Sequence, residues 1–179
     1  MRALFPALLA SLTSCAGAYH HGALLVDPET GAAWGNARAY PCVDAVVHVE
    51  SFAEVPPGGQ VVGLELGNPC GVSVETDYGA LRVRMARERE GVVSELVTAT
   101  AWDPRHEIRR ARLAPRDRVL ERIVFFDETT ASSAPVVRVC VGLHGVIPSA
   151  PPEDEVCFRR RHVRDEEGVD MLASWEVDP

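Results

Sequence analysis

The sequence predicts an all-β protein, an antiparallel β-sandwich of about seven to nine short strands. One observation is the two-residue alternation of apolar and polar side chains, as in residues 60–67 (QVVGLELG), where Glu65 lies between apolar neighbours. That period indicates a strand with one buried face. The other observation is that turn-forming residues, such as Asn68-Pro69 and Asp77-Tyr78-Gly79, recur between these segments and divide them into short strands.

The chain begins with the features of an export signal. Arg2 provides a positive charge, and residues 3–12 form a short apolar run. A run of this length is too short to cross a bilayer as a stable helix, but it matches the hydrophobic region of a signal peptide. Residues 1–14 are therefore predicted to direct export and to be removed.

Leu12-Thr13-Ser14-Cys15 resembles the lipobox of bacterial lipoproteins, an aliphatic residue and two small residues before a cysteine. The resemblance implies that the Cys15 thiol carries a diacylglycerol and that Cys15 becomes the first residue. Ala16, in the place where an aspartate would retain enteric lipoproteins, implies sorting to the outer membrane. An ordinary cleaved signal followed by an incidental cysteine is the alternative.

Residues 15–41 are expected to form the lipidated N-terminus and a flexible tether, because small and polar residues dominate there. One short strand is expected at residues 23–26. His20-His21 also lies in this segment. We interpret the pair as part of a solvated linker, since no further ligands stand at the spacing of a zinc site.

The globular domain is predicted over residues 42–164, followed by an acidic C-terminal tail over residues 165–179. Residues 82–96 could also favour a helix, because they contain Met-Ala-Arg-Glu-Arg-Glu. The alternation of Leu81, Val83 and Met85 favours a strand instead. The strands are expected at about 43–52, 60–67, 71–76, 80–87, 92–102, 106–113, 118–126, 135–144 and 155–162.

Two segments resemble the strand-to-strand crossings of immunoglobulin-like domains in secreted bacterial proteins. They are Asn68-Pro69-Cys70-Gly71, before the strand that starts near Val72, and Arg112-Leu113-Ala114-Pro115, before a long apolar strand. The resemblance implies an immunoglobulin-like β-sandwich over most of residues 42–162. The cysteine and tryptophan arrangement of antibody domains is absent from the sequence.

Four cysteines remain beyond Cys15, and an even number in an exported chain predicts disulfides. Cys42 and Cys70 are almost equally far from the turn at residues 56–59, and Cys140 and Cys157 flank the turn-rich residues 148–152. Residues equidistant from a hairpin turn face each other. The predicted disulfides are therefore Cys42–Cys70 and Cys140–Cys157. A four-cysteine zinc site is disfavoured, because these cysteines form no C-x-x-C pairs.

The charge balance narrows the classes of partner. The chain has a formal net charge of −8, which disfavours nucleic acid as a partner. All of its 18 basic residues are arginine. The absence of lysine excludes a Walker A loop, a Schiff-base enzyme and a Ser-Lys dyad, each of which requires a lysine amine.

The basic residues concentrate in the middle of the chain. Residues 82–122 hold eleven arginines and seven acidic residues, whereas the segments on both sides are acidic. Guanidinium groups suit carboxylates and phosphates. One hypothesis is that the arginines of this segment form a patch for an anionic glycan, a lipid headgroup or an acidic partner. The alternative is that they pair with acidic strands. The candidates are Arg82, Arg84, Arg87, Arg89, Arg109, Arg110 and Arg112.

No catalytic residue, metal site or cofactor is predicted. His106-Glu107 begins like a zinc-protease motif, but Arg110 stands where the second histidine is required. Two alternatives to a non-catalytic binding module remain. An enzyme with scattered catalytic residues requires a deep pocket that gathers histidines beside carboxylates, the candidates being His48, His106, His144 and His162. A small-ligand or glycan carrier requires exposed tryptophans among Trp34, Trp102 and Trp175, although Trp102 is expected in the core.

The sequence thus predicts a non-catalytic, lipid-anchored protein of the bacterial envelope that acts as a binding or structural module. Its membrane contact is expected through acyl chains on Cys15, and its partner is expected to be an envelope protein or a glycan. Loops offer contact surfaces in a sandwich, and the expected contact tips are residues 127–134 and 147–155.

Overall fold

The computed structural model describes residues 19–50, 59–102, 110–127, 134–164, 170–172 and 174–178. The signal peptide, Cys15, His106, Arg109 and most of the loop at 127–134 lie outside these residues. The described chain is all-β apart from one short 3-10 helix, η1 (Tyr78–Ala80). No helix within the described ranges is long and apolar enough to span a membrane.

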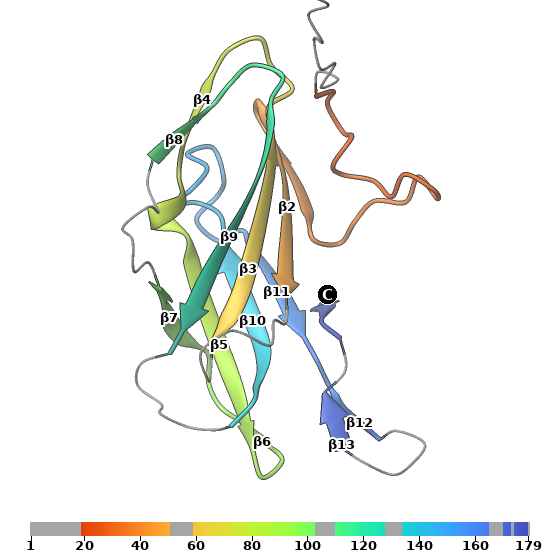
Figure 1. The fold of residues 1–179 in the computed structure, drawn as a ribbon, viewed down its shortest axis with the longest axis vertical. Coiled ribbons are helices and arrows are strands. Elements are labelled where there is room, and N and C mark those ends of the chain that lie inside the picture. Colours follow the sequence, from red (N-terminus) through yellow and green to blue (C-terminus); the bar gives the residue numbers. More distant parts are fainter. Residues whose placement is uncertain are drawn as a thin grey trace, which may run out of the picture.

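The strands lie in two layers, and each is antiparallel to its neighbours (Figure 1). The front layer holds β1 (Ala37–Tyr40), β2 (Val43–Glu50), β3 (Gln60–Gly67) and β9 (Arg118–Phe126), in that order. The second layer holds β5 (Arg82–Arg89), β10 (Val136–Gly142), β11 (Glu155–Arg159) and β14 (Glu176–Asp178).

A single strand joins the two layers. The first half of β7 (Val97–Trp102) pairs with β5, and its second half pairs with β9. Strands that change sheets in this way turn the corner of a sandwich. The smaller pairings are β4 (Val74–Asp77) with β8 (Arg110–Leu113), β6 (Val92–Val93) with β5, and β12 (His162–Arg164) with β13 (Asp170–Leu172).

The strands predicted within residues 42–164 are confirmed in the described residues. Those expected at 60–67 and 118–126 coincide with β3 and β9, and the others overlap β2, β4, β5, β7, β8, β10 and β11. The short strand expected at residues 23–26 is wrong, because only Val26 forms a bridge there, an isolated one to Ala33. Residues 82–89 form a strand rather than a helix. Glu90 and Gly91 both have positive φ, 52° and 79°, which is the backbone of the two-residue turns that connect tight hairpins. That turn joins β5 to the short strand β6.

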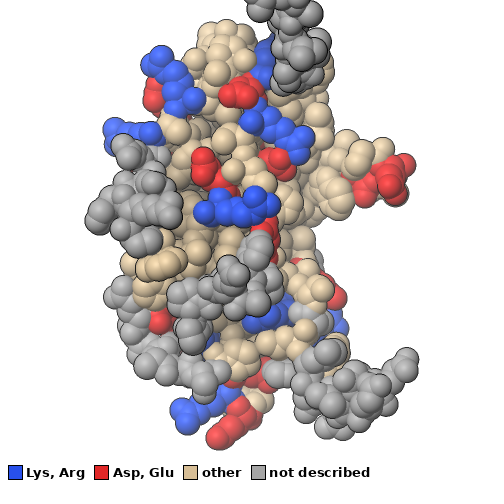
Figure 2. Space-filling model, in the orientation of Figure 1, with Lys and Arg blue, Asp and Glu red and all other residues tan. Residues whose placement is uncertain are grey.

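The core forms between the two layers from the alternating apolar residues. Val62, Leu64 and Leu66 of β3 are fully buried, as are Val139 and Val141 of β10. Outward residues of the front layer are charged and pair across strands, for example Arg118 with Glu65 and Arg122 with Glu50. Figure 2 shows acidic and basic side chains interspersed over this face.

The first and last described segments of the chain are more ordered than the sequence predicts. The expected tether at 15–41 is wrong for residues 19–40, because Tyr19 and Leu24 are buried and residues 37–40 form β1. The expected tail at 165–179 contributes β13 and β14. Trp175 and Val177 pack against the core, which explains why an acidic segment folds onto the sheet.

Both predicted disulfides are present. Cys140 and Cys157 face each other across β10 and β11, and Cys42 is joined to Cys70 where β2 begins and β3 has ended. The two bonds close loops with sequence separations of 28 and 17 residues. Each bond limits the freedom of the unfolded chain.

We predict that replacing both cysteines of either pair with alanine lowers the free energy of unfolding by about 3–4 kcal/mol, as loop-closure entropy implies. Urea titration followed by tryptophan fluorescence measures the change. Dithiothreitol should also lower the urea midpoint of the wild type. It should lower the midpoint of a double-alanine variant by less, because that variant already lacks one disulfide. A wild-type midpoint insensitive to reductant contradicts the prediction.

Candidate functional site

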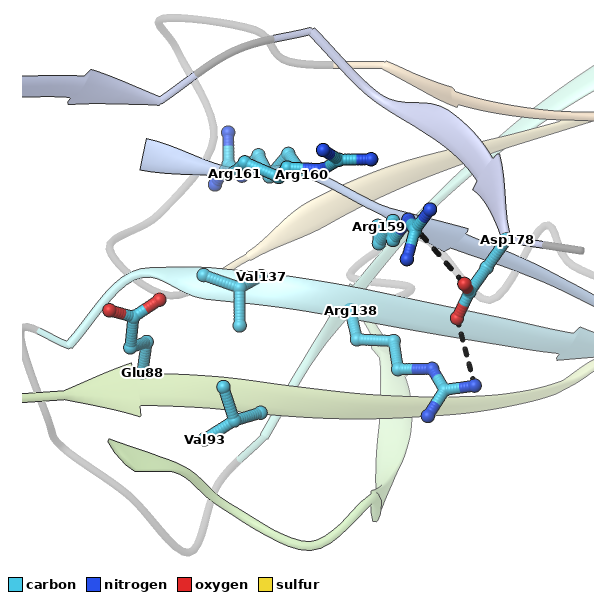
Figure 3. Close-up of a pocket in the computed structure, with 8 residues that line it drawn as sticks. All are labelled: Glu88, Val93, Val137, Arg138, Arg159, Arg160, Arg161 and Asp178. Atoms are coloured by element: carbon cyan, nitrogen blue, oxygen red, sulfur yellow. Dashed lines mark ion pairs between the residues drawn. The ribbon is translucent and has the colours of Figure 1, made fainter. Parts of the chain in front are cut away.

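The main candidate site is a groove on the second layer with a volume of about 470 Å³. Its lining comes from β5, β6, β10, β14 and from β11 with the two residues after it (Figure 3). We call it the arginine groove, because four of its eight lining residues are arginines: Arg138, Arg159, Arg160 and Arg161, with Glu88, Val93, Val137 and Asp178.

The register of β10 and β11 places two of these arginines side by side. Arg138 lies directly opposite Arg159, two residues along each strand from the Cys140–Cys157 disulfide. Like charges directly opposite each other destabilise an antiparallel pair. Asp178 of β14 lies between them, with carboxylate oxygens 2.9 Å from Arg138 Nη2 and 3.5 Å from Arg159 Nε. Figure 3 shows this carboxylate between the two guanidinium groups.

A β-bulge shapes the wall of the groove. Val136 pairs with Arg87 and Arg138 pairs with Ala86, so Val137 is an extra residue in β10. A bulge bends its strand and redirects the side chains beside it. The bulge therefore gives Arg138 its position at the edge of the groove.

The other two arginines follow β11. Arg160 donates from Nε to the carbonyl oxygen of Val136 at 2.7 Å, and its guanidinium lies 4.7 Å from the centroid of the Trp175 ring. Burial lowers the pKa of Arg160 without removing its charge at neutral pH. Arg161 is more exposed, and its Nη2 lies 3.8 Å from the Glu176 carboxylate.

The lining is thus basic in an acidic protein. Four guanidinium groups surround two carboxylates, those of Glu88 and Asp178, whereas the whole chain has a net charge of −8. The net charge of the lining is therefore positive, and net positive charge in a concave surface attracts anionic ligands. The groove therefore has the electrostatic character of an anion site.

The arginines predicted from the sequence do not line this groove. Arg84, Arg110 and Arg112 pair with Glu155, Asp77 and Glu75, respectively. Arg87 is 7% exposed and donates to the Ala134 carbonyl oxygen, while Arg82 and Arg89 are exposed. Most of the described arginines of the predicted patch therefore pair with acidic residues, which was the alternative to a ligand-binding patch. Arg109 lies outside the described residues. The signal that could have identified the groove is the run Arg159-Arg160-Arg161.

A second feature holds residues 19–22 against the opposite end of the sandwich. Asp44 of β2 is fully buried, and its Oδ2 accepts hydrogen bonds from the Tyr19 hydroxyl at 2.5 Å and the Gly22 amide at 2.8 Å. His21 Nδ1 lies 3.1 Å from Oδ1. A buried carboxylate requires such donors. We call Tyr19, His21, Gly22 and Asp44 the N-terminal clasp.

Gly67 makes room for the clasp. A Cβ atom at this position would lie within 2.4 Å of the Tyr19 ring, which is closer than carbon atoms can pack. The Tyr19 amide also donates to the carbonyl oxygen of Arg116 at 2.8 Å. Ring, hydroxyl and backbone thus all hold Tyr19 to the domain.

None of the histidines whose side chains the structure describes lines either of the two cavities. A smaller cavity of about 310 Å³ lies beside Thr76, Arg110 and Val146. His48 is 3.9 Å from Glu65, and His144 Nδ1 is 2.5 Å from the carbonyl oxygen of Ala150. His106 and the side chain of His162 lie outside the described structure.

One group in the described chain has the spacing of metal ligands, Cys140, Glu155 and Cys157. The two sulfur atoms are joined in the disulfide, and thiolates rather than disulfides bind metals. This group is therefore explained by the disulfide and its neighbouring carboxylate.

Two further expectations change. Trp102 is 45% exposed rather than buried, because Ala99 and Ala101 occupy the inward positions of β7. Trp34, also exposed, lies before β1, so these two rings come from distant segments.

In the predicted contact loop at 147–155, Ile147 and Ala150 are buried, which leaves Pro151 and its exposed neighbours as the accessible part.

Known proteins give little guidance. No family model and no curated protein matches the chain. Among solved structures, the yjhA protein from Bacillus subtilis matches with a TM-score of 0.39 and 9% identity, over 77% of this chain and 94% of that chain. A similarity this low carries no argument about function.

We predict that Tyr19→Phe lowers the free energy of unfolding by about 2 kcal/mol, because the buried Asp44 carboxylate loses a hydrogen-bond donor. Urea titration at neutral pH measures the loss. Tyr40→Phe is the matched control, because its hydroxyl partner Asp154 is partly exposed and water can replace the donor. Equal losses in the two variants contradict the prediction.

The same tyrosine predicts a pH dependence. Burial, and then the hydrogen bond to Asp44, raise the pKa of Tyr19 above its ordinary value of 10.0. The folded protein therefore keeps the phenol neutral where the unfolded chain ionises it, and this contribution to stability is lost as the pH rises above about 10. Wild type should lose stability more steeply than Tyr19→Phe between about pH 10 and pH 12, measured by urea midpoints.

Proposed function

We propose that the protein is an exported bacterial lipoprotein, acylated at Cys15, which acts as a non-catalytic binding or structural module of the cell envelope. The observation that supports this most directly is the N-terminal clasp. Tyr19 packs into the domain only four residues after the lipobox cysteine. The lipobox and the folded domain are therefore nearly continuous.

The short connection restricts where the domain can sit. Four extended residues span at most about 14 Å. An acylated Cys15 in the bilayer surface would hold Tyr19, and with it the beginning of β2 and the end of β3, close to the lipid headgroups. A long tether would leave the orientation of the domain free, whereas this connection restricts it.

The opposite end of the sandwich would then face away from the bilayer. In Figure 1 the first described residues and the start of β2 lie toward the top, while β6 and the β12–β13 hairpin lie at the bottom. The arginine groove belongs to that lower end, because it includes Val93 of β6 and the residues that follow β11. A surface held away from the membrane is available to envelope partners.

The two disulfides support the export half of the proposal. Disulfides persist in oxidising compartments such as the bacterial periplasm and are rare in the cytosol. Both pairs link strands or strand ends in the sandwich. A domain stabilised in this way suits the envelope, where an envelope protein or a glycan is the proposed partner. The outer membrane is the proposed location.

We predict that the protein isolated from its bacterial host begins at Cys15 and carries fatty acyl mass. Cys15→Ser should remove that mass and move the protein from the detergent-rich to the aqueous phase of a Triton X-114 separation, because the acyl chains supply the membrane affinity. Intact-mass spectrometry and immunoblotting of the two phases measure these changes.

Ser11→Ala is a matched control, because it leaves Leu12-Thr13-Ser14-Cys15 unchanged and should still be acylated. A native polypeptide that retains Met1 and lacks acyl mass would disprove the proposed anchor.

A further inference from the structure

We propose that the arginine groove binds the carboxylate group of a small acidic ligand. This inference goes beyond the proposed anchor and does not depend on acylation. It depends on the cross-strand arginine pair, on a carboxylate of the chain itself that already occupies part of the groove, and on the space beside that carboxylate.

The arginine pair departs from the way charges are arranged elsewhere in the described sheets. Charged residues that face each other directly across strands have opposite signs in β4–β8, where Glu75 faces Arg112 and Asp77 faces Arg110. Among the described strand pairings, Arg138 and Arg159 are the one directly opposed pair of like charge. Such a pair costs stability, and an anion between the two arginines removes the cost.

Asp178 shows which chemistry the pair accepts. Its two carboxylate oxygens lie near different guanidinium groups, one near Arg138 and one near Arg159. The contact with Arg138, at 2.9 Å, has the length of a charge-assisted hydrogen bond between arginine and a carboxylate, whereas the contact with Arg159 is a longer ion pair at 3.5 Å. Asp178 lies on β14, a three-residue strand at the edge of the sheet. The chain therefore supplies a tethered carboxylate at the margin of the groove.

Arg161 offers donors to a second anion. A guanidinium group carries five N–H donors, and Arg161 lies on the rim of the groove in an ion pair with Glu176. Arg161 is 65% exposed, and its partner Glu176 is 60% exposed at 3.8 Å. An exposed ion pair of this kind contributes little free energy, so Arg161 can turn toward a ligand at small cost.

The groove also has room for a ligand. A volume of about 470 Å³ lies within the range of small-molecule sites. Val93 is 53% exposed and lies across the groove from the arginines of β11 (Figure 3). Apolar contact beside charged donors is the usual composition of such sites. A compact ligand with one or more carboxylates matches this combination.

The first experiment tests the ligand class by isothermal titration calorimetry of the purified full chain at low salt. The probes are citrate, trigalacturonate, inorganic phosphate and the neutral trisaccharide maltotriose. We expect a carboxylate probe to bind with a Kd below about 1 mM and to weaken as salt rises. Citrate and trigalacturonate distinguish a simple carboxylate from one on a sugar.

Three results would overturn the proposal. One is no binding by either carboxylate probe. Another is phosphate binding as tight as the better carboxylate, which would assign the groove to phosphate. The third is maltotriose binding as tight as trigalacturonate, which would assign recognition to the sugar instead of its charge.

The second experiment uses the tethered carboxylate as a competitor. Asp178→Asn removes the negative charge, while the pairing of this residue with Cys157 keeps β14 in place. If a ligand carboxylate uses the same guanidinium donors, its affinity should rise roughly tenfold. A purely structural role for Asp178 predicts no gain, so unchanged or weaker binding contradicts the proposal.

Arginine variants complete the test. Arg138→Gln and Arg161→Gln should each weaken the carboxylate probe roughly tenfold. Arg89→Gln is the matched control, because Arg89 is exposed at the end of β5 and does not line the groove, and its affinity should match wild type. Unfolding midpoints identify any variant that fails to fold. The exposed Arg161 then decides the outcome alone, and unchanged affinity in Arg161→Gln disproves the site.

Discussion

The pairing of β10 with β11 is the constraint on which the rest of the second layer depends. Its register turns Val139, Val141, Val156 and Phe158 toward the core and places Cys140 opposite Cys157. The same register brings Arg138 opposite Arg159, since Arg138 lies two residues before Cys140 and Arg159 lies two residues after Cys157 in the antiparallel strand. A shift by one residue would expose the valines and separate the cysteines. The core and the disulfide together therefore hold the arginines in a position that their own charges disfavour.

A buried charge has a comparable role at the other end of the sandwich. Asp44 lies within β2 with no solvent exposure, so its carboxylate must obtain donors from the protein. The hydroxyl of Tyr19 and the amide of Gly22 supply them from residues that precede the sheet. Gly67 permits the approach, because it has no Cβ atom to meet the Tyr19 ring. A segment that composition presents as a tether thus becomes part of the domain.

The sequence was sufficient where the determining pattern is local. The alternation in residues 60–67 predicts β3. The positions of Cys140 and Cys157 on either side of one turn-rich segment predict their disulfide, because the turn determines which residues of its two strands face each other. The clasp and the groove depend on contacts between distant segments. Tyr19 and Asp44 are 25 residues apart, and the groove joins Arg138, Arg159 and Asp178 from three strands. The charge count along the sequence places Arg138 and Arg159 in an acidic segment. It does not predict the groove, because the sequence does not reveal which strands lie side by side.

The arginine groove also shows how local conflict can indicate function. Natural sequences tend to satisfy propensity, packing and charge at the same time, and the exceptions concentrate at functional sites. In the front layer, outward charges follow that rule, because Glu65 pairs with Arg118 and Glu50 with Arg122. At the bulge of β10 the rule fails, and a third strand is needed to neutralise the pair. A neutral residue at either position would remove the conflict with no loss to the core, because both side chains point away from it. A role for the guanidinium groups as donors to an anion accounts for why both are present.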